Sequence, residues 1–290
     1  MTTDYRSALA SSVAGRVSPR PGWEIITLLV TVKAYPAISK KSGESVCIAG
    51  IRLDTPQPEW VRLFPVGFRA LPSRQQFKKY QVVTLRASKR SGSDQRPESF
   101  QPDLDTLTLG PLVDTDGGSW KRRWEIVEGL AGMTTTCALY RAARTAGQAA
   151  PSLGLVKPRD IDLTVHDNPD YLPGGSAQVD VDLFGNEREV LEKTPFIVTY
   201  HYRCADSACK GHHQQIVDWE SGQLARSNLQ DRSPDEAKQG HRARFLDDMC
   251  SRGRDTYFFV GNQHQYPSSF LVLGLFWPKR NSRPQPTLVF

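Results

Sequence analysis

Apolar residues along this chain recur mainly at every second position, which is the spacing of half-buried β-strands. The clearest example is 196–202, where large aromatic or branched side chains alternate with smaller or polar ones. Stretches of similar character predict strands at 24–35, 46–51, 60–65, 81–87, 106–109, 153–156, 161–165, 196–202, 216–219, 256–261 and 268–277.

Helical periodicity is limited to the middle of the chain and one later segment. Ser119 is a typical N-cap residue, and the residues after it predict helices at 120–129 and 134–146. A short helix is also predicted at 241–252, which carries three large apolar residues. The segment 220–240 is polar, and we expect it to be a loop.

Many short strands between Gly- or Pro-containing turns, with little helix, predict a mainly β protein built from barrels or sandwiches. Gly50 lies inside a predicted strand, which indicates a bulge or the close backbone approach that barrel corners require. The nucleotide-binding GxGxxG and GxxxxGK[ST] motifs and the GxSxG motif of hydrolases do not occur. We expect a flexible leader (1–22), an N-terminal β-barrel (23–116), a helical linker (117–150) and a C-terminal β-rich domain (151–290).

Positive charge is concentrated at the front of the chain. The net charge is +6, but residues 1–100 carry 16 Lys and Arg against 7 Asp and Glu, and 62–96 contains nine basic residues and one acid. A polyanion such as nucleic acid is the natural partner, and a solvated basic face is the alternative. The candidate nucleic-acid contacts are Arg62, Arg69, Lys78, Lys79, Arg90, Arg96 and Lys40, with Tyr35 and Trp60 as stacking surfaces.

The hairpin at 196–220 carries a C-x4-C-x2-H-H pattern made by Cys204, Cys209, His212 and His213. Thiolate and imidazole are the ligands that tetrahedral zinc prefers, so the spacing predicts a structural zinc knuckle. The fourth ligand is open among the two adjacent histidines, His201 and the distant Cys250. An ordinary polar loop without metal and a catalytic zinc site are the alternatives.

Two pairs of carboxylates are candidates for catalysis. Asp94 and Glu98 flank Arg96, which can keep them ionised or position a phosphate. An internal salt-bridged turn is the alternative for this pair. Asp218 and Glu220 form the second pair, which could equally be a solvated edge.

The chain has the character of a cytoplasmic protein. Its first 22 residues are polar and lack the apolar core of a signal peptide, and no apolar run reaches the ~18 residues of a membrane span. An odd number of cysteines, five in all, favours free thiols or metal over disulfides.

The stretches VKAYPAISKKSGESVCIAGI, EWVRLFPVGFR, FKKY and DQRPES resemble the bacterial proteins described as dual OB domain-containing. The similarity is clearest over 33–99, with weaker support at 204–220 and 258–273. The resemblance implies two OB-like β-barrels joined by a short helical segment, which read DNA or RNA. It also implies a place in bacterial antiphage (antiviral) defence, with neighbouring defence proteins as candidate partners. The Cys/His turn has no counterpart in a generic OB barrel.

Some defence proteins of this kind are DNA glycosylases, hydrolases that remove modified bases from phage DNA. Such an enzyme needs a flipped base, an aromatic or apolar pocket and a carboxylate. Either carboxylate pair could serve, with Tyr35, Trp60 or Trp219 as the stacking surface. A reader that recruits an effector remains an alternative, as does a metal-dependent nuclease using Asp94, Glu98 and either Asp180 or Asp182.

Overall fold

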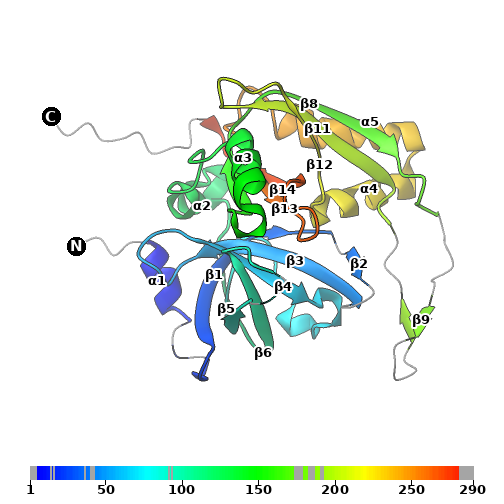
Figure 1. Ribbon diagram of the computed structural model, residues 1–290. Helices are drawn as coiled ribbons and strands as arrows, with labels where there is room; N and C mark the ends of the chain where they lie inside the picture. Colours follow the sequence, from blue (N-terminus) through cyan, green and yellow to red (C-terminus); the bar gives the residue numbers. More distant parts are fainter. Residues whose placement is uncertain are drawn as a thin grey trace.

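The computed structural model describes residues 5–13, 15, 17–35, 37–39, 43–90, 92, 94–172, 179–181, 187–189 and 193–280. Lys40 and Asp182 lie outside these residues. The protein is mainly β, as predicted, with one β unit from each half of the chain stacked on the other (Figure 1).

The N-terminal unit is a closed barrel of five strands. The order around the barrel is β1-β3-β4-β6-β5, and β1 pairs with both β3 and β5, which closes it. All pairings are antiparallel except that of β4 with β6. The closed barrel agrees with the prediction for this half of the chain. Its strands are β1 (Glu24–Lys33), β3 (Gly43–Arg52), β4 (Trp60–Val66), β5 (Gln81–Lys89) and β6 (Ser99–Leu112).

Gly50 allows two barrel strands to approach closely. A Cβ placed on Gly50 would lie 2.3 Å from the carbonyl oxygen of Leu29 on β1, so any side chain would push the strands apart. Inside the barrel, apolar residues that alternate along the strands fill the core. They include Ile26, Leu28, Val30, Ile48, Leu63, Val83 and Leu85.

The described part of the leader forms helix α1 (Tyr5–Ser11) and packs on the barrel. Leu9 and Val13 are buried, and the Arg6 guanidinium donates to the carbonyl oxygen of Arg52 at 2.8 Å. Apolar contact and this hydrogen bond therefore attach the segment to the end of β3.

Two helices connect the halves of the chain, close to the predicted positions. Helix α2 (Lys121–Val127) buries Ile126 and Val127. Helix α3 (Thr136–Ala146) begins at Thr135, whose hydroxyl accepts from the backbone N–H of Ala138 at 3.1 Å. The helix packs its buried face on the C-terminal unit.

The C-terminal unit consists of two three-stranded sheets that share a nearly continuous strand. β7 pairs with β13 in one sheet, and β8 pairs with β11 in the other. At the far ends, a parallel bridge between Ile216 and Val272 connects the β12 end of one sheet to β14 of the other. The strands are β7 (Leu153–Val156), β8 (Pro158–Asp167), β11 (Phe196–Cys204), β12 (His212–Gln215), β13 (Tyr257–Asn262) and β14 (Phe270–Phe276).

The prediction of a loop at 220–240 is wrong, because helices α4 (Trp219–Asp231) and α5 (Pro234–Arg242) occupy this segment. Asp218 caps α4, and Ser233 forms a capping box with Glu236 at the start of α5. The faces that α4 and α5 bury are built largely from small residues, which explains why the segment looks polar in sequence. The helices lie beside β8, β11 and β12 (Figure 1).

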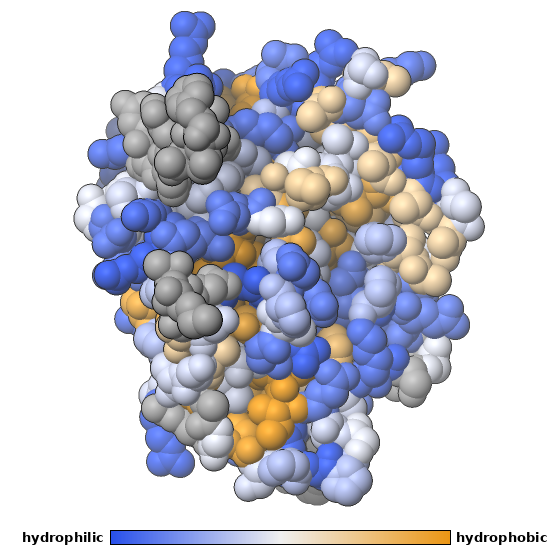
Figure 2. Space-filling view, turned by 90° about the vertical axis from the view of Figure 1, so that its left-hand side faces the viewer, coloured by the Kyte–Doolittle hydropathy of each residue, from blue (hydrophilic) through white to orange (hydrophobic). Residues whose placement is uncertain are grey.

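Among the helices of the described residues, none is long and apolar enough to cross a membrane. On the face seen from the left of Figure 1, hydrophilic residues dominate and hydrophobic ones reach the surface in patches (Figure 2).

The remaining elements are short. They are β2 (Ala37–Ser39), β9 (Val179–Val181), β10 (Glu187–Glu189), the 3-10 turns η1 (Phe68–Ala70), η2 (Ser73–Gln75), η3 (Asp116–Gly118) and η4 (Gly147–Ala149), and the π-helical turn η5 (Ala243–Asp248).

The two units are joined through backbone and core contacts. The chain leaving β1 runs antiparallel to the residues just before α4, with a bridge between Ala34 and Asp218. The Tyr35 N–H donates to the carbonyl oxygen of Val217 at 2.6 Å. A hydrophobic cluster also crosses the junction, with Leu29 from β1 and Phe276 from β14 in the same core. The segment 33–35 therefore lies directly beside 217–219.

Candidate functional site

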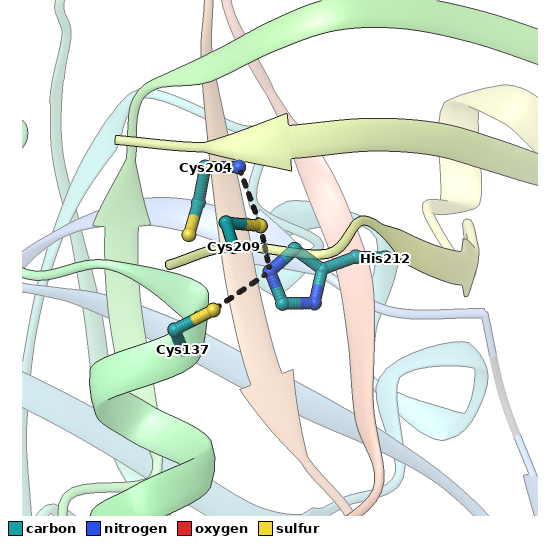
Figure 3. A group of neighbouring side chains, drawn as sticks. All are labelled: Cys137, Cys204, Cys209 and His212. Carbon is teal, nitrogen blue, oxygen red and sulfur yellow. Dashed lines mark hydrogen bonds between the residues drawn. The ribbon is translucent and has the colours of Figure 1, made fainter. Parts of the chain in front are cut away.

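Four potential metal ligands gather between α3 and the β11–β12 hairpin. Cys204 ends β11, Cys209 lies in the turn and His212 begins β12, whereas Cys137 comes from the first turn of α3 (Figure 3). The three sulfur atoms and one ring nitrogen of the four residues all lie within 4.8 Å of one another. This cluster, hereafter the Cys3His cluster, could hold a metal ion such as zinc.

The geometry of the Cys3His cluster fits tetrahedral zinc. His212 Nε2 lies 3.5 Å from Cys137 Sγ and 3.2 Å from Cys209 Sγ. Zinc bonds of ~2.3 Å to sulfur and ~2.0 Å to nitrogen would place such atoms about 3.5 Å apart at tetrahedral angles. A metal held by all four residues would have no open position for substrate, which is the arrangement typical of structural zinc sites.

Backbone groups also favour a thiolate at Cys209. The N–H groups of Cys204 and Gly211 both donate to its sulfur at 3.4 Å. Burial opposes ionisation of this thiol, but these two donors lower the pKa of Cys209. Burial and the neighbouring thiols raise the pKa of Cys137 to about 12. Burial lowers the pKa of His212, which keeps the imidazole neutral, as metal binding requires.

The other predicted candidates for the fourth ligand point elsewhere. His213 lies outside the cluster, and its Nδ1 is 2.6 Å from Nδ1 of His201 on the neighbouring strand. Cys250 donates to the carbonyl oxygen of Phe245 at 3.4 Å, and burial raises the pKa of its thiol to about 12. The fourth position is taken by Cys137, a residue far upstream that the hairpin spacing could not indicate.

The Asp94 and Glu98 carboxylates are both engaged inside the protein. Arg96 forms a bidentate pair with Asp94, with both N–O distances at 2.9 Å. Glu98 accepts from the backbone N–H and the hydroxyl of Ser152, both at 2.9 Å. Burial opposes ionisation of Asp94, but its bonds with Arg96 lower the pKa to about 2. This arrangement matches the internal salt-bridged turn, which the sequence analysis gave as the alternative to a catalytic pair.

Replacing Asp94 by alanine is expected to lower the free energy of unfolding by about 3–5 kcal/mol, because it leaves the buried Arg96 guanidinium without its carboxylate. Urea denaturation followed by fluorescence measures this loss. The matched control is Asp170→Ala, which breaks an exposed pair with Lys193 and should cost no more than about 1 kcal/mol. Equal losses in the two variants would contradict the assignment.

The basic candidates divide into interior and surface residues. Arg62 is only 3% exposed and donates to the carbonyl oxygen and hydroxyl of Ser152. Arg90 donates to the carbonyl oxygen of Phe64 at 2.8 Å. Arg69 and Lys78 are exposed, on the connection between β4 and β5. Trp60 is half-buried against the edge of Phe259, which belongs to β13.

Three predicted residues meet at the junction of the two units. The Lys79 ammonium lies 2.8 Å from Asp218 Oδ2 and 3.3 Å from Glu220 Oε2. Asp218 is 3% exposed, whereas the Glu220 side chain is 61% exposed. Burial raises the pKa of Asp218 against the opposing effect of Lys79. Burial disfavours the charge on Lys79, but the two carboxylates raise its pKa overall.

Aromatic residues line the same junction. The rings of Tyr35 and Trp219 are stacked with centroids 5.8 Å apart. Lys33 Nζ lies 3.7 Å from the Phe68 ring centroid and 4.8 Å from that of Trp219. Lys33 and Phe68 were not predicted as site residues, because in sequence they belong to ordinary apolar segments. We call the set Lys33, Tyr35, Phe68, Lys79, Asp218, Trp219 and Glu220 the junction site.

A cavity of about 180 Å³ adjoins the junction site. It lies under α4 and shares Tyr35 and Asp218 with the junction site. Ser221 also lines it, and its hydroxyl lies 3.0 Å from Nε2 of the buried His241. The remaining walls are Thr194, Phe196, Val198, Gln215, Ile216, Val217, Gly222 and Ala225.

Comparison with known proteins gives two family matches. No curated protein matches the chain. One solved structure, described as "Structure of murine DNA binding protein bound with ds DNA", is 8% identical with a TM-score of 0.27, covering 88% of this chain and 97% of that one. Residues 24–129 match the domain of unknown function DUF8758. Residues 132–289 match the domain of unknown function DUF8757, so the chain belongs to the DUF8757 family.

Proposed function

We propose that the protein is a DNA-binding protein made of two OB-like barrels, which removes a modified base at the junction site. The strand order supports two related units. In the first the order is β1-β3-β4-β6-β5, and in the second it is β7/β8-β11-β12-β14-β13. Counted along the chain, with β2 left out and β7 and β8 taken as one strand, the third and fifth strands are β4 and β6 in the first unit and β12 and β14 in the second. In both units these two strands meet in a parallel pairing. OB barrels of five strands commonly bind oligonucleotides.

The cavity under α4, which adjoins the junction site, is the proposed pocket for the base. An enzyme that acts on a base in DNA extrudes it from the stack into a closely fitting pocket. The cavity has apolar walls from Phe196, Val198 and Ile216, and Gln215 and Ser221 can hydrogen-bond the edge of a base. The observation that carries the proposal is that this cavity adjoins a buried carboxylate and stacked aromatic rings.

The junction site supplies the groups that base excision needs. Asp218 lines the cavity, where a carboxylate can stabilise the positive charge that develops on the sugar as the base leaves. Lys79 fixes this carboxylate in place. Tyr35 and Trp219 offer a stacked surface for a neighbouring base. The exposed Arg69 and Lys78 flank the site and can contact phosphates.

We also propose that the Cys3His cluster binds a structural zinc ion. Bound there, the metal would join α3 to the β11–β12 hairpin, and so fix the strands that form part of the cavity wall. This role is separate from the chemistry at the junction site.

The purified protein should be incubated with unmodified and naturally modified phage DNA, which the resemblance to defence proteins makes the first substrate to test. Breaks that appear only after alkali treatment indicate abasic sites and support base excision. Breaks without alkali whose ends carry intact deoxyribose would instead indicate a nuclease, whereas an imine at C1′ breaks the strand only at a sugar that has lost its base. A gel shift without breaks would indicate a reader that recruits an effector.

Filling the cavity should block base removal. Ala225 lies on α4 and lines the cavity, so Ala225→Leu is expected to lower the rate of abasic-site formation at least about tenfold by excluding the base. The control is Ala146→Leu, at the exposed end of α3, which should keep the full rate. Unchanged activity in a folded Ala225→Leu variant would contradict the assignment of the cavity.

A further inference from the structure

We propose that Lys33 is a nucleophile of the junction site, whose amine forms an imine with C1′ of a deoxyribose. The inference deepens the proposed function and rests on it for the identity of the substrate. Lys33 is the last residue of β1 and is 9% exposed. The Ala34–Asp218 bridge places it opposite Trp219, and Asp218, the residue before Trp219, lines the cavity.

Lys33 differs from a structural lysine in what surrounds its amine. Its Nζ faces the rings of Phe68 and Trp219 and makes no hydrogen bond or ion pair with any described residue. The charged groups near it are Lys79, before β5, and Asp218 and Glu220, at the start of α4. Both carboxylates are bonded to Lys79, so Lys33 has no counterion in contact.

This environment favours the free amine. Burial and the nearby Lys79 ammonium lower the pKa of Lys33 to about 8, against the opposing effect of the two carboxylates. At pH 8 about half of the Lys33 amine is then unprotonated, compared with less than about 1% for a lysine of ordinary pKa. A desolvated lysine beside a second cation is a known way to activate an amine nucleophile. Lys79 itself, paired with two carboxylates, stays protonated.

The covalent step balances without an added cofactor. The unprotonated Lys33 amine attacks C1′, the bond from C1′ to the base nitrogen breaks, and the base leaves with the electron pair and takes up a proton. The nitrogen then loses one proton, which offsets the proton taken up by the base. The sugar ring opens as the nitrogen lone pair forms the C=N bond and the ring oxygen leaves C1′, and the second amine proton passes to that oxygen, which becomes a hydroxyl group. An imine between Lys33 and C1′ results. With DNA that already lacks the base, the same amine condenses with the C1′ aldehyde and releases water.

Borohydride trapping tests the inference. A duplex oligonucleotide with one abasic deoxyribose is incubated with the full-length protein and sodium borohydride, which reduces an imine to a stable amine. The expected result is a covalent protein–DNA adduct that peptide mass mapping assigns to Lys33. The yield should rise with pH with a midpoint near the Lys33 pKa of about 8.

Matched variants separate Lys33 from other amines. Lys33→Arg keeps the positive charge over the rings and should reduce the adduct at least about tenfold. Lys121→Arg, on the exposed face of α2, should leave it unchanged. An adduct that maps to Lys79, or that survives in Lys33→Arg, would overturn the inference.

The two proposals can fail separately. Alkali-labile sites in phage DNA without any trapped adduct would refute the role of Lys33 but leave base excision intact. An adduct with abasic DNA, together with no base removal from any tested DNA, would refute base excision and leave Lys33 as a nucleophile toward abasic sites.

Discussion

Replacing Cys137 by serine is expected to release zinc from the purified protein and to lower its Tm by about 10 °C or more. Structural zinc sites bind with apparent free energies of ~10–16 kcal/mol, and that energy contributes to folding. For a chain of this size, each kcal/mol of lost stability corresponds to roughly 2–4 °C. Loss of one of four ligands also removes the metal link between α3 and the hairpin, although contacts such as that of Thr136 with Tyr202 remain. Elemental analysis and a thermal melt measure the two effects.

The controls for this prediction are variants of two other residues that the sequence analysis offered as the fourth zinc ligand. His213→Ala and Cys250→Ala should keep about one equivalent of zinc, because both side chains point away from the Cys3His cluster. Loss of zinc from His213→Ala with retention in Cys137→Ser would reverse the assignment. Less than about half an equivalent in the unchanged protein would count against the metal itself.

The fourth ligand shows which part of a metal site a sequence can reveal. Cys204, Cys209 and His212 belong to one hairpin, so their spacing along the chain limits their spacing in the fold. Cys137 reaches them only because α3 packs on the C-terminal unit. That contact depends on tertiary packing, which the local pattern around Cys137 does not record.

The strands were predicted better than the helices for a similar reason. Alternation at 196–202 reflects the direct environment of each residue, buried on one face and half-exposed on the other. Helices α4 and α5 bury small residues such as Gly222, Ala225 and Ala237, which leave little hydrophobic signal. The capping box of Ser233 and Glu236 was nevertheless legible in the sequence.

The carboxylate pairs were equally visible in sequence, but only the partner of the first pair was visible as well. Asp94 is paired with Arg96, two residues away, within one turn. Asp218 is paired with Lys79, which lies 139 residues away and belongs to the other unit. Spacing alone treats both pairs as candidates. The long-range partner places Asp218 between the units, beside a cavity, and makes it the stronger candidate for chemistry.

Replacing Asp218 by asparagine is expected to reduce base removal by a factor of about 100 or more, because the neutral amide cannot stabilise positive charge on the sugar. The side chain keeps its shape, so DNA binding should change little in a gel-shift titration. Glu220→Gln is the matched control: its side chain is largely exposed and lies outside the cavity walls, so activity should fall far less. Equal losses in the two variants would contradict the role assigned to Asp218.

Loss of folding must be separated from loss of chemistry at this site. Asp218→Asn leaves the buried Lys79 ammonium with Glu220 as its remaining carboxylate, and breaking a buried pair in this way costs about 3–5 kcal/mol. The double variant Lys79→Met with Asp218→Asn removes that uncompensated charge and should recover most of the stability. If Asp218 acts on the substrate, the double variant will melt close to the original temperature and still form no abasic sites. Recovery of activity together with stability would show that Asp218 serves only to pair Lys79.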